Sequence, residues 1–283
     1  MPEAAAVARI VRQAAALMRS EAGREGNIQP IDADEILVGG DLHGHTPNFK
    51  RLVALADLAA QPHRHLILQE FVHGPGRYSN GGDTSHQVLD LACALKCKHP
   101  RQVHLLPGNH ELSELTGRSI AKTGVALNEL FALGLIHQYG SGAADVSNAY
   151  HELFRSMPLA IRTRNRILCV HTTPSAKSLD QFNIDVFRRF GPIMEEAERG
   201  GSLYAALWDR DLAESTTQRF AAMMDVDWFV TGHIPLEGGF EMPNPRRIIV
   251  DCCGEPAGYA LLPASRPITA EEFAAGLKNL PVG

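Results

Sequence analysis

Two short polar stretches decide how this chain is interpreted. Residues 40–45 have the sequence Gly-Asp-Leu-His-Gly-His, and residues 108–111 have the sequence Gly-Asn-His-Glu. An apolar, β-like run precedes each of them, at residues 36–38 and 103–106. The two turns therefore offer Asp, His, Asn and His side chains at the ends of predicted strands. Oxygen and imidazole donors of this kind suit a hydrated divalent metal site and not a thiolate one.

Two further histidines occupy the same kind of position. His171 follows the apolar run 166–170, and His233 follows the run 228–232. The first half of the chain has a β-α-β-α-β pattern, which predicts a parallel sheet. Ligands of such sheets gather at the carboxyl ends of the strands. We therefore expect the four strand-end sites to converge on one active site.

The pattern predicts a single α/β domain over residues 1–283. Its parts are an N-terminal helix over 1–24, a core over 35–262 and a C-terminal helix over 269–280. Residues 23–34 read as a polar link and residues 159–170 as a hairpin. In the first helix of the core, Thr46 is expected as N-cap with Pro47 at the first helical position. Two more stretches are predicted to be helical, 119–157 and 179–199.

Composition limits the possible partners. The chain has 283 residues, is 45% hydrophobic and 21% charged, and has a net charge of -5. This balance gives no electrostatic reason to expect nucleic acid or an anionic membrane as a partner. The five cysteines have neither zinc-site nor secreted-scaffold spacing. We expect them to be reduced, and hence expect a cytoplasmic protein.

Taken in order, these motifs resemble those of the calcineurin-like metallophosphoesterases, and within them the serine/threonine phosphatases of the phosphoprotein-phosphatase type. The likeness covers about residues 35–262. The resemblance implies a four-layer α/β/β/α sandwich with a dinuclear metal site at the strand ends. It is carried by five segments: 40–45, 85–111, 169–171, 206–211 and 226–233.

The resemblance also implies roles for individual residues. Two divalent ions, with Mn first and Fe or Zn as alternatives, would activate a bridging water that attacks a phosphorylated substrate. His110 would donate a proton to the leaving oxygen, held in its working tautomer by a carboxylate such as Glu111 or Asp209. The expected metal ligands are Asp41, His43, Glu70, Asn109, His171 and His233.

One motif departs from the family pattern. The family has Gly-Asp-x-x-Asp-Arg-Gly before the helix that begins near Ser85, and its first Asp bridges the two metals. A gapless alignment places Arg77 at that Asp, where a cation cannot replace a carboxylate. A second alignment places Glu70 there, in the pair Gln69-Glu70 that directly follows the strand at 66–68, with an insertion within 71–82. Asp83 is the alternative carboxylate, and we count it with His110 and Arg77 among the candidate catalytic residues.

The departure also removes the arginine that grips phosphate. Three other arginines are candidates for that role, Arg77, Arg118 and Arg210, because a guanidinium fork matches phosphate oxygens. We expect a phosphatase for phosphomonoesters, with phosphoserine and phosphothreonine in proteins as one substrate class. The alternatives are a small-molecule or dinucleoside polyphosphate phosphoesterase, and a catalytically impaired phosphatase that serves as a binding protein.

Overall fold

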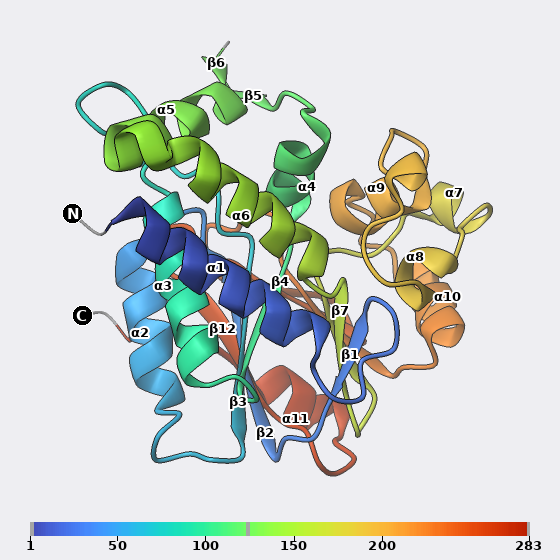
Figure 1. Ribbon diagram of the computed structural model, residues 1–283. Helices are drawn as coiled ribbons and strands as arrows, with labels where there is room; N and C mark the ends of the chain where they lie inside the picture. The colour runs from blue at the N-terminus through green and yellow to red at the C-terminus, as the bar shows by residue number, and fades with distance from the viewer. Residues whose placement is uncertain (1–2, 123–124, 282–283) are drawn as a thin grey trace.

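The computed structural model describes residues 3–122 and 125–281. Two β-sheets pack face to face between two layers of helices (Figure 1). The five-stranded sheet has the order β13-β12-β2-β3-β4, formed by Leu277–Asn279, Gly258–Pro263, Glu35–Asp41, Arg64–Gln69 and Val103–Leu106. The six-stranded sheet has the order β1-β7-β8-β9-β11-β10, formed by Ile28–Ile31, Ala160–Thr163, Ile167–Val170, Trp228–Thr231, Arg247–Val250 and Phe240–Asn244.

The predicted β-α-β-α-β unit is confirmed. Strands β2, β3 and β4 are parallel, and the helices α2 (Thr46–Ala56) and α3 (His86–Lys98) connect them. The expected N-cap of α2 is wrong by one residue. His45 takes that position, because its Nδ1 accepts a hydrogen bond from the N–H of Asn48 at 3.2 Å. Because β2, β3 and β4 are parallel, their carboxyl ends lie at the same edge of the sheet.

The core has three parts, which account for the four layers. Residues such as Ile36 and Ile67 of one sheet pack between the sheets against Ile167 and Val230 of the other. On the outer face of the five-stranded sheet lie α1 (Ala4–Arg19), α2, α3, α5 (Leu127–Tyr139) and α6 (Ala143–Ser156). The six-stranded sheet is covered by α8 (Asp185–Arg188), α9 (Ser202–Trp208) and α10 (Glu214–Met224). The predicted α/β/β/α sandwich is confirmed.

Towards both ends of the chain, several elements differ in type or length from those predicted, whereas the predicted hairpin is confirmed. The link at 23–34 contains β1, which pairs with β7 in parallel, and the hairpin at 159–170 is present as β7 and β8. The first helix ends at Arg19, short of residue 24, and residues 1–2 lie outside the described part. The last helix is α11 (Ala270–Ala275). It ends before Gly276, after which β13 pairs with β12.

The two other predicted helical stretches are also shorter than expected. Before α5, the strands β5 (Ala121–Lys122) and β6 (Val125–Ala126) form a small hairpin, and residues 123–124 lie outside the described part. The short 3₁₀ turn η1 (Gly140–Gly142) separates α5 from α6. Between residues 176 and 199 the structure has short pieces only, namely α7 (Ala176–Leu179), α8 and η2 (Met194–Glu196).

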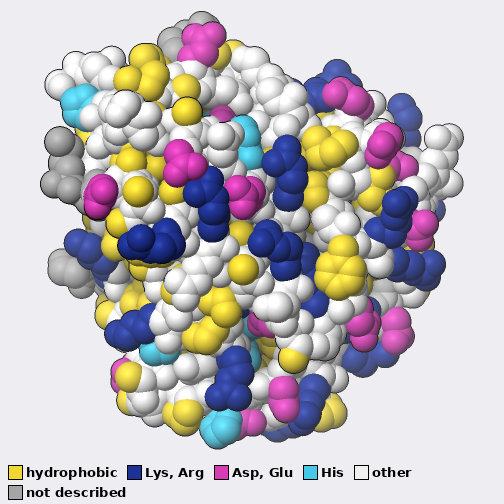
Figure 2. All heavy atoms as spheres, in the orientation of Figure 1, with side chains coloured by type: hydrophobic (Ala, Val, Ile, Leu, Met, Phe, Trp, Pro, Cys, Tyr) yellow, Lys and Arg dark blue, Asp and Glu magenta, His cyan; other side chains and the backbone are white. Residues whose placement is uncertain are grey.

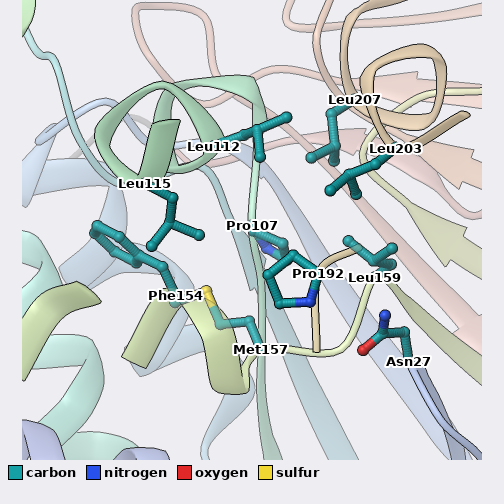
Figure 3. A pocket seen from close by; sticks show the side chains of 10 residues that line it. All are labelled: Asn27, Pro107, Leu112, Leu115, Phe154, Met157, Leu159, Pro192, Leu203 and Leu207. Atoms are coloured by element: carbon teal, nitrogen blue, oxygen red, sulfur yellow. The ribbon is translucent and has the colours of Figure 1, made fainter. Parts of the chain in front are cut away.

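A small apolar cavity lies behind α4 (Asn109–Thr116), the helix that follows β4. Its volume is about 20 Å³, roughly the room of one water molecule (Figure 3). Side chains of α4, of α9 and of α6 with its C-cap residue Met157 meet there, among them Leu112, Leu115, Phe154, Leu203 and Leu207. This packing fixes the position of α4, and with it the residues at the amino end of the helix.

The surface seen in Figure 2 carries basic and acidic side chains intermingled over α1 and α6. Such a mixture does not form a patch of one sign on this face. All five cysteines are free thiols. In the described residues, no helix has both the length and the apolar character that a membrane span requires.

Candidate metal centre

Four strand ends from the two sheets meet at one place. Asp41 is the last residue of β2, and Glu70 directly follows β3. On the other sheet, His171 directly follows β8 and His233 lies two residues after β9. The sheets approach closely here, since a Cβ atom on Gly40 would lie 2.4 Å from the Cα of Asp251. The expected convergence of these side chains is present in the structure.

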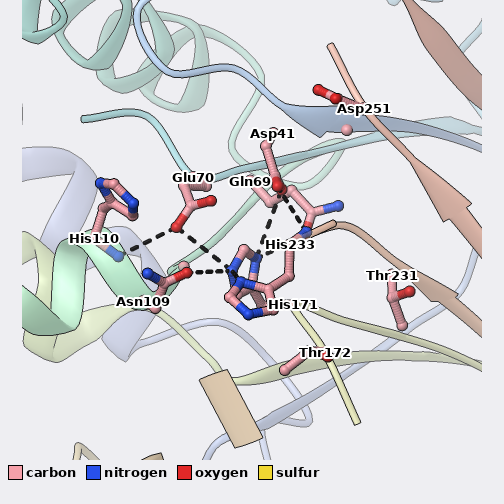
Figure 4. A network of polar contacts seen from close by, with 12 residues as sticks. Asp41, Gln69, Glu70, Asn109, His110, His171, Thr172, Thr231, His233 and Asp251 are labelled. Atoms are coloured by element: carbon pink, nitrogen blue, oxygen red, sulfur yellow. Dashed lines mark hydrogen bonds and ion pairs between the residues drawn. The ribbon is translucent and has the colours of Figure 1, made fainter. Parts of the chain in front are cut away.

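Glu70 lies at the centre of this group and points one carboxylate oxygen to each side. Its Oε2 lies 3.2 Å from Nε2 of His43, and its Oε1 lies 3.4 Å from Nε2 of His171. The N–H of His110 also donates to Oε1, at 3.2 Å (Figure 4). A carboxylate placed in this way can contact two ions at once.

Nitrogen and oxygen donors surround Oε1 of Glu70. The Nε2 of His171 lies 3.1 Å from Oδ1 of Asn109 and 3.2 Å from Nδ1 of His233. Oδ1 of Asp41 lies 3.6 Å from the other ring nitrogen of His171, Nδ1 (Figure 4). Within residues 3–122 and 125–281, two groups of His, Asp and Glu have ligand atoms that lie within 4.8 Å of one another, and Glu70 belongs to both: His43, Glu70, His110 and Asp41, Glu70, His171.

The donors and their surroundings fit divalent cations. Oδ1 of Asp41 is buried and accepts no hydrogen bond from the part of the chain that the structure describes. Burial, followed by repulsion from Glu70, raises the pKa of Asp41 well above its usual value. A cation between the two carboxylates would relieve this repulsion. Glycines leave room for both carboxylates, because a Cβ would lie 2.1 Å from Glu70 at Gly108 and 2.1 Å from Asp41 at Gly232.

The imidazoles differ in their protonation. Burial lowers the pKa of His171, and burial with the nearby His171 lowers the pKa of His233 to about 3. The ring of His233 is therefore neutral, as a metal ligand must be. Burial would also lower the pKa of His43, but the carboxylate of Glu70 outweighs it and raises that pKa to about 10. In turn, the imidazoles of His171, His43 and His110 outweigh burial and hold the pKa of Glu70 well below its usual value.

The backbone at the site is held in an unusual conformation. Four non-glycine residues have positive φ: His43 at 39°, Glu70 at 44°, His73 at 64° and His233 at 70°. Such conformations persist only where the surrounding structure enforces them, and they concentrate at functional sites. Three of the four are expected metal ligands, and the fourth is His73.

His73 and Glu114 lie beside His110, and sequence reasoning assigned neither of them a role. Nδ1 of His73 lies 3.0 Å from Nδ1 of His110, and Nε2 of His73 lies 2.7 Å from Oε1 of Glu114. A signal for His73 was present. When the family motif Gly-Asp-x-x-Asp-Arg-Gly is set with its first Asp on Glu70, the second Asp falls on His73 and the Arg on Gly74.

The two carboxylates expected to hold His110 have other partners. Glu111 accepts hydrogen bonds from the N–H groups of Phe71, Val72 and Gly108, at 2.8, 3.1 and 2.7 Å. It therefore ties α4 to the loop after β3. Asp209 accepts from the N–H of Ser175 at 2.8 Å and from the hydroxyl of Ser178 at 2.6 Å.

The candidate arginines lie in three different settings. Arg210 is exposed, and its Nε donates to Nε2 of His233 at 3.1 Å, so its guanidinium borders the metal centre. Arg118 pairs with Glu198, and its guanidinium lies 5.3 Å from the ring centroid of Tyr204.

The third candidate, Arg77, is exposed and donates to the carbonyl groups of Gly74 and Gly76, at 2.6 and 2.8 Å. It also lies 4.0 Å from Asp83. Asp83 is buried, and it accepts the N–H of Ser85 at 2.7 Å. Burial raises its pKa.

Residues 35–249, more than half of the chain, match the model of the calcineurin-like phosphoesterase family. The chain belongs to this family. It is accordingly a phosphoric ester hydrolase, a metal-dependent phosphatase, and the resemblance noted in its motifs is confirmed. The structure is similar to solved phosphatase structures, which have the same fold.

One of these is a serine/threonine phosphatase from Saccharomyces cerevisiae with similarity to human phosphatase PP5. It has a TM-score of 0.70 and 21% identity, over 100% of this chain and 91% of that chain. Another is a cold-active protein-tyrosine phosphatase of a psychrophilic Shewanella species. It has a TM-score of 0.62 and 16% identity, over 94% of this chain and 84% of that chain.

Proposed function

We propose that this calcineurin-like phosphoesterase hydrolyses phosphomonoesters, with phosphoserine and phosphothreonine in proteins as its first substrate class, and that it uses two Mn²⁺ ions. The position of Glu70 carries the proposal, since its two oxygens face two separate groups of donors. Its carboxylate supplies the anionic charge that two neighbouring cations require between them. The missing Asp of the family motif therefore does not leave the centre without a bridging group.

The residues of the chain divide the work of hydrolysis. When bound, the two ions lower the pKa of a coordinated water and neutralise charge on the phosphoryl oxygens. Asp41, His43 and Glu70 would hold one ion, and Glu70 with Asn109, His171 and His233 would hold the other. Arg210 lies at the rim, where its two terminal guanidinium nitrogens can bind phosphate oxygens. His110 donates a proton to the leaving oxygen.

A phosphoprotein substrate is supported by the solved structures with the same fold, which are described as serine/threonine and protein-tyrosine phosphatases. The sequence motifs favour the serine/threonine type between these two. We also propose a cytoplasmic location, because all five cysteines are free thiols.

The test measures hydrolysis of p-nitrophenyl phosphate by metal-stripped protein refilled with Mn²⁺. We compare wild type with Glu70→Gln, which keeps the shape of the side chain but removes its charge. Asp83→Asn is the matched control at the alternative carboxylate. We expect Glu70→Gln to lose activity by at least about 100-fold and to bind fewer than two Mn²⁺ ions, whereas Asp83→Asn keeps both properties.

Each of the other outcomes would assign a different bridging residue or a different function to the protein. Loss of activity and of one metal ion in Asp83→Asn alone would transfer the bridging role to Asp83. A wild type that binds Mn²⁺, Fe²⁺ or Zn²⁺ but hydrolyses neither p-nitrophenyl phosphate nor a phosphoserine peptide would be a binding protein on a phosphatase fold. Hydrolysis of small phosphate esters without hydrolysis of phosphopeptides would favour a small-molecule phosphatase.

A further inference from the structure

We propose that His73 and Glu114 are positioning residues that fix the ring of His110 in the tautomer needed to protonate the leaving group. The inference rests on the proposed phosphatase function and names two residues of that function. It is carried by a continuous chain of contacts. Nδ1 of His110 lies 3.0 Å from Nδ1 of His73, and Nε2 of His73 lies 2.7 Å from Oε1 of Glu114.

The chemistry of the three groups assigns the protons. An ionised carboxylate only accepts hydrogen bonds, so Nε2–H of His73 donates to Glu114. In a neutral imidazole the other nitrogen is then an acceptor. The Nδ1 of His73 therefore accepts a hydrogen bond from Nδ1–H of His110. This leaves Nε2 of His110 as the nitrogen that can give a proton to a substrate.

His73 is held firmly in this orientation. Its side chain is fully buried, and its backbone N–H donates to the hydroxyl of Ser85 at 3.0 Å. Its ring meets the ring of Phe131 edge-on, with 5.8 Å between the centroids. Its φ of 64° lies in the left-handed region, which residues with a side chain adopt uncommonly, so the surrounding structure holds the position.

Glu114 is anchored as well. Its Oε1 also accepts a hydrogen bond from Nδ2 of Asn128 on α5, at 2.8 Å. Glu114 and His110 both belong to α4 and lie four residues apart, which places them on the same face of that helix. The loop after β3 supplies His73 between them. Three elements thus build one arrangement: α4, α5 and the loop.

The arrangement serves a single proton transfer. Protonated His110 gives its Nε2 proton to the leaving oxygen as the oxygen of the attacking water bonds to phosphorus and the bond between phosphorus and the leaving oxygen breaks. Its Nδ1–H remains hydrogen-bonded to His73, and solvent water returns a proton to Nε2 before the next turnover. His73 and Glu114 keep their protonation throughout, since they orient the ring and stabilise its charged form.

The leaving group of the substrate distinguishes this role from a merely structural one. Phenyl phosphate has a poor leaving group and needs the proton, whereas p-nitrophenyl phosphate needs it much less. We measure kcat and KM for both esters with Mn²⁺-loaded wild type, Glu114→Gln and His73→Gln. Glu129→Gln, which changes an exposed carboxylate on α5, is the control.

We expect both variants to lose about 10- to 100-fold in kcat for phenyl phosphate and less than about 3-fold for p-nitrophenyl phosphate, because general acids contribute about 100-fold or more. KM and the Mn²⁺ content should stay at wild-type values. An equal loss for both esters, or no loss for either, would overturn the role of His73 and Glu114 while leaving the phosphatase intact. A wild type without activity towards either ester would instead refute the proposed function.

A second measurement keeps the inference testable if a variant does not fold. Nitrogen-15 NMR of metal-free wild type reports which nitrogens of each histidine ring carry a proton. The arrangement requires His73 to be protonated at Nε2 and unprotonated at Nδ1. The opposite tautomer, or a ring of His73 that is protonated at both nitrogens at neutral pH, would contradict the assignment.

Discussion

A Cβ atom on Gly108 would lie 2.1 Å from Oε1 of Glu70, so the carboxylate at the centre of the site occupies the space that any other side chain would need. Gly108 has a φ of -100°, which every amino acid can adopt. The glycine is therefore required for space and not for its conformational freedom. The turn before α4 and the carboxylate after β3 depend on each other.

This relationship predicts the effect of Gly108→Ala. The new methyl group would displace Glu70, and we expect Mn²⁺ binding to weaken by at least about 10-fold, as for the loss of groups that orient metal ligands. Isothermal titration of metal-free protein with Mn²⁺ measures this. The control is Gly254→Ala, where a Cβ would meet no atom within 4 Å. Wild-type affinity in Gly108→Ala would show that Glu70 does not need its present position.

The raised pKa of His43 predicts that metal binding depends on pH. Glu70 holds this pKa at about 10, against an ordinary value of 6.5, so His43 carries a proton at neutral pH that a metal ligand must lose. Binding of Mn²⁺ should therefore release at least about one proton, and affinity should rise about 10-fold per pH unit from pH 7 to 9. Calorimetry in two buffers with different ionisation enthalpies counts the protons.

The stability of the metal-free fold should change with pH in the opposite direction, since it falls as pH rises. Protonated His43 stabilises the fold fully below about pH 6.5, and this contribution is lost as pH rises through about 10.

His45→Asn is the matched control for the measurement of proton release in His43→Asn. The pKa of His45 is lowered by burial and by Arg51, and Asn keeps the N-cap of α2. The same proton release in His43→Asn and in wild type would contradict the assignment to His43.

Two of the three candidate arginines, Arg210 and Arg118, can be distinguished by kinetics. Arg210 lies at the rim of the site, whereas Arg118 is paired with Glu198. We expect Arg210→Ala to lower kcat/KM for p-nitrophenyl phosphate by about 10- to 100-fold, since hydrogen bonds to charged groups contribute about 1.5–3 kcal/mol. Arg118→Ala should change it less than about 2-fold. The reverse order of the two losses would place the phosphate beside Arg118.

The strand ends of the site could be predicted from the sequence because each polar residue directly follows an apolar run. For Asp41 and His171, the preceding apolar run was enough to predict a position at a strand end, because parallel strands have their carboxyl ends at the same edge of a sheet. The contact between His73 and Glu114 had no such local signal. The two residues are 41 positions apart in the chain, and only the packing of the loop after β3 against α4 brings them together.

The missed strand β1 has a different cause. It has four residues, lies at the edge of its sheet and contains Pro30, which gives it little strand character on its own. Its pairing with β7 supplies the hydrogen bonds that define it. The overlong C-terminal helix has a similar origin, since pairing of Leu277–Asn279 with β12 replaces further helical turns. In both places tertiary pairing overrode local preference.

The cavity behind α4 predicts that a core substitution at Leu112, close to the site, destabilises the fold. Leu112 is buried and lines this cavity, so Leu112→Ala would enlarge a space that already exists. We expect the free energy of unfolding to fall by about 3 kcal/mol or more, measured by urea denaturation of metal-free protein. Leu91→Ala on α3 removes the same atoms from a side chain that is 40% exposed and should cost less than about 1 kcal/mol. Because Asn109 and His110 lie within one helical turn of Leu112, the variant should also lose kcat at temperatures where it remains folded. Unchanged stability and kcat would show that α4 is held by contacts other than this apolar packing.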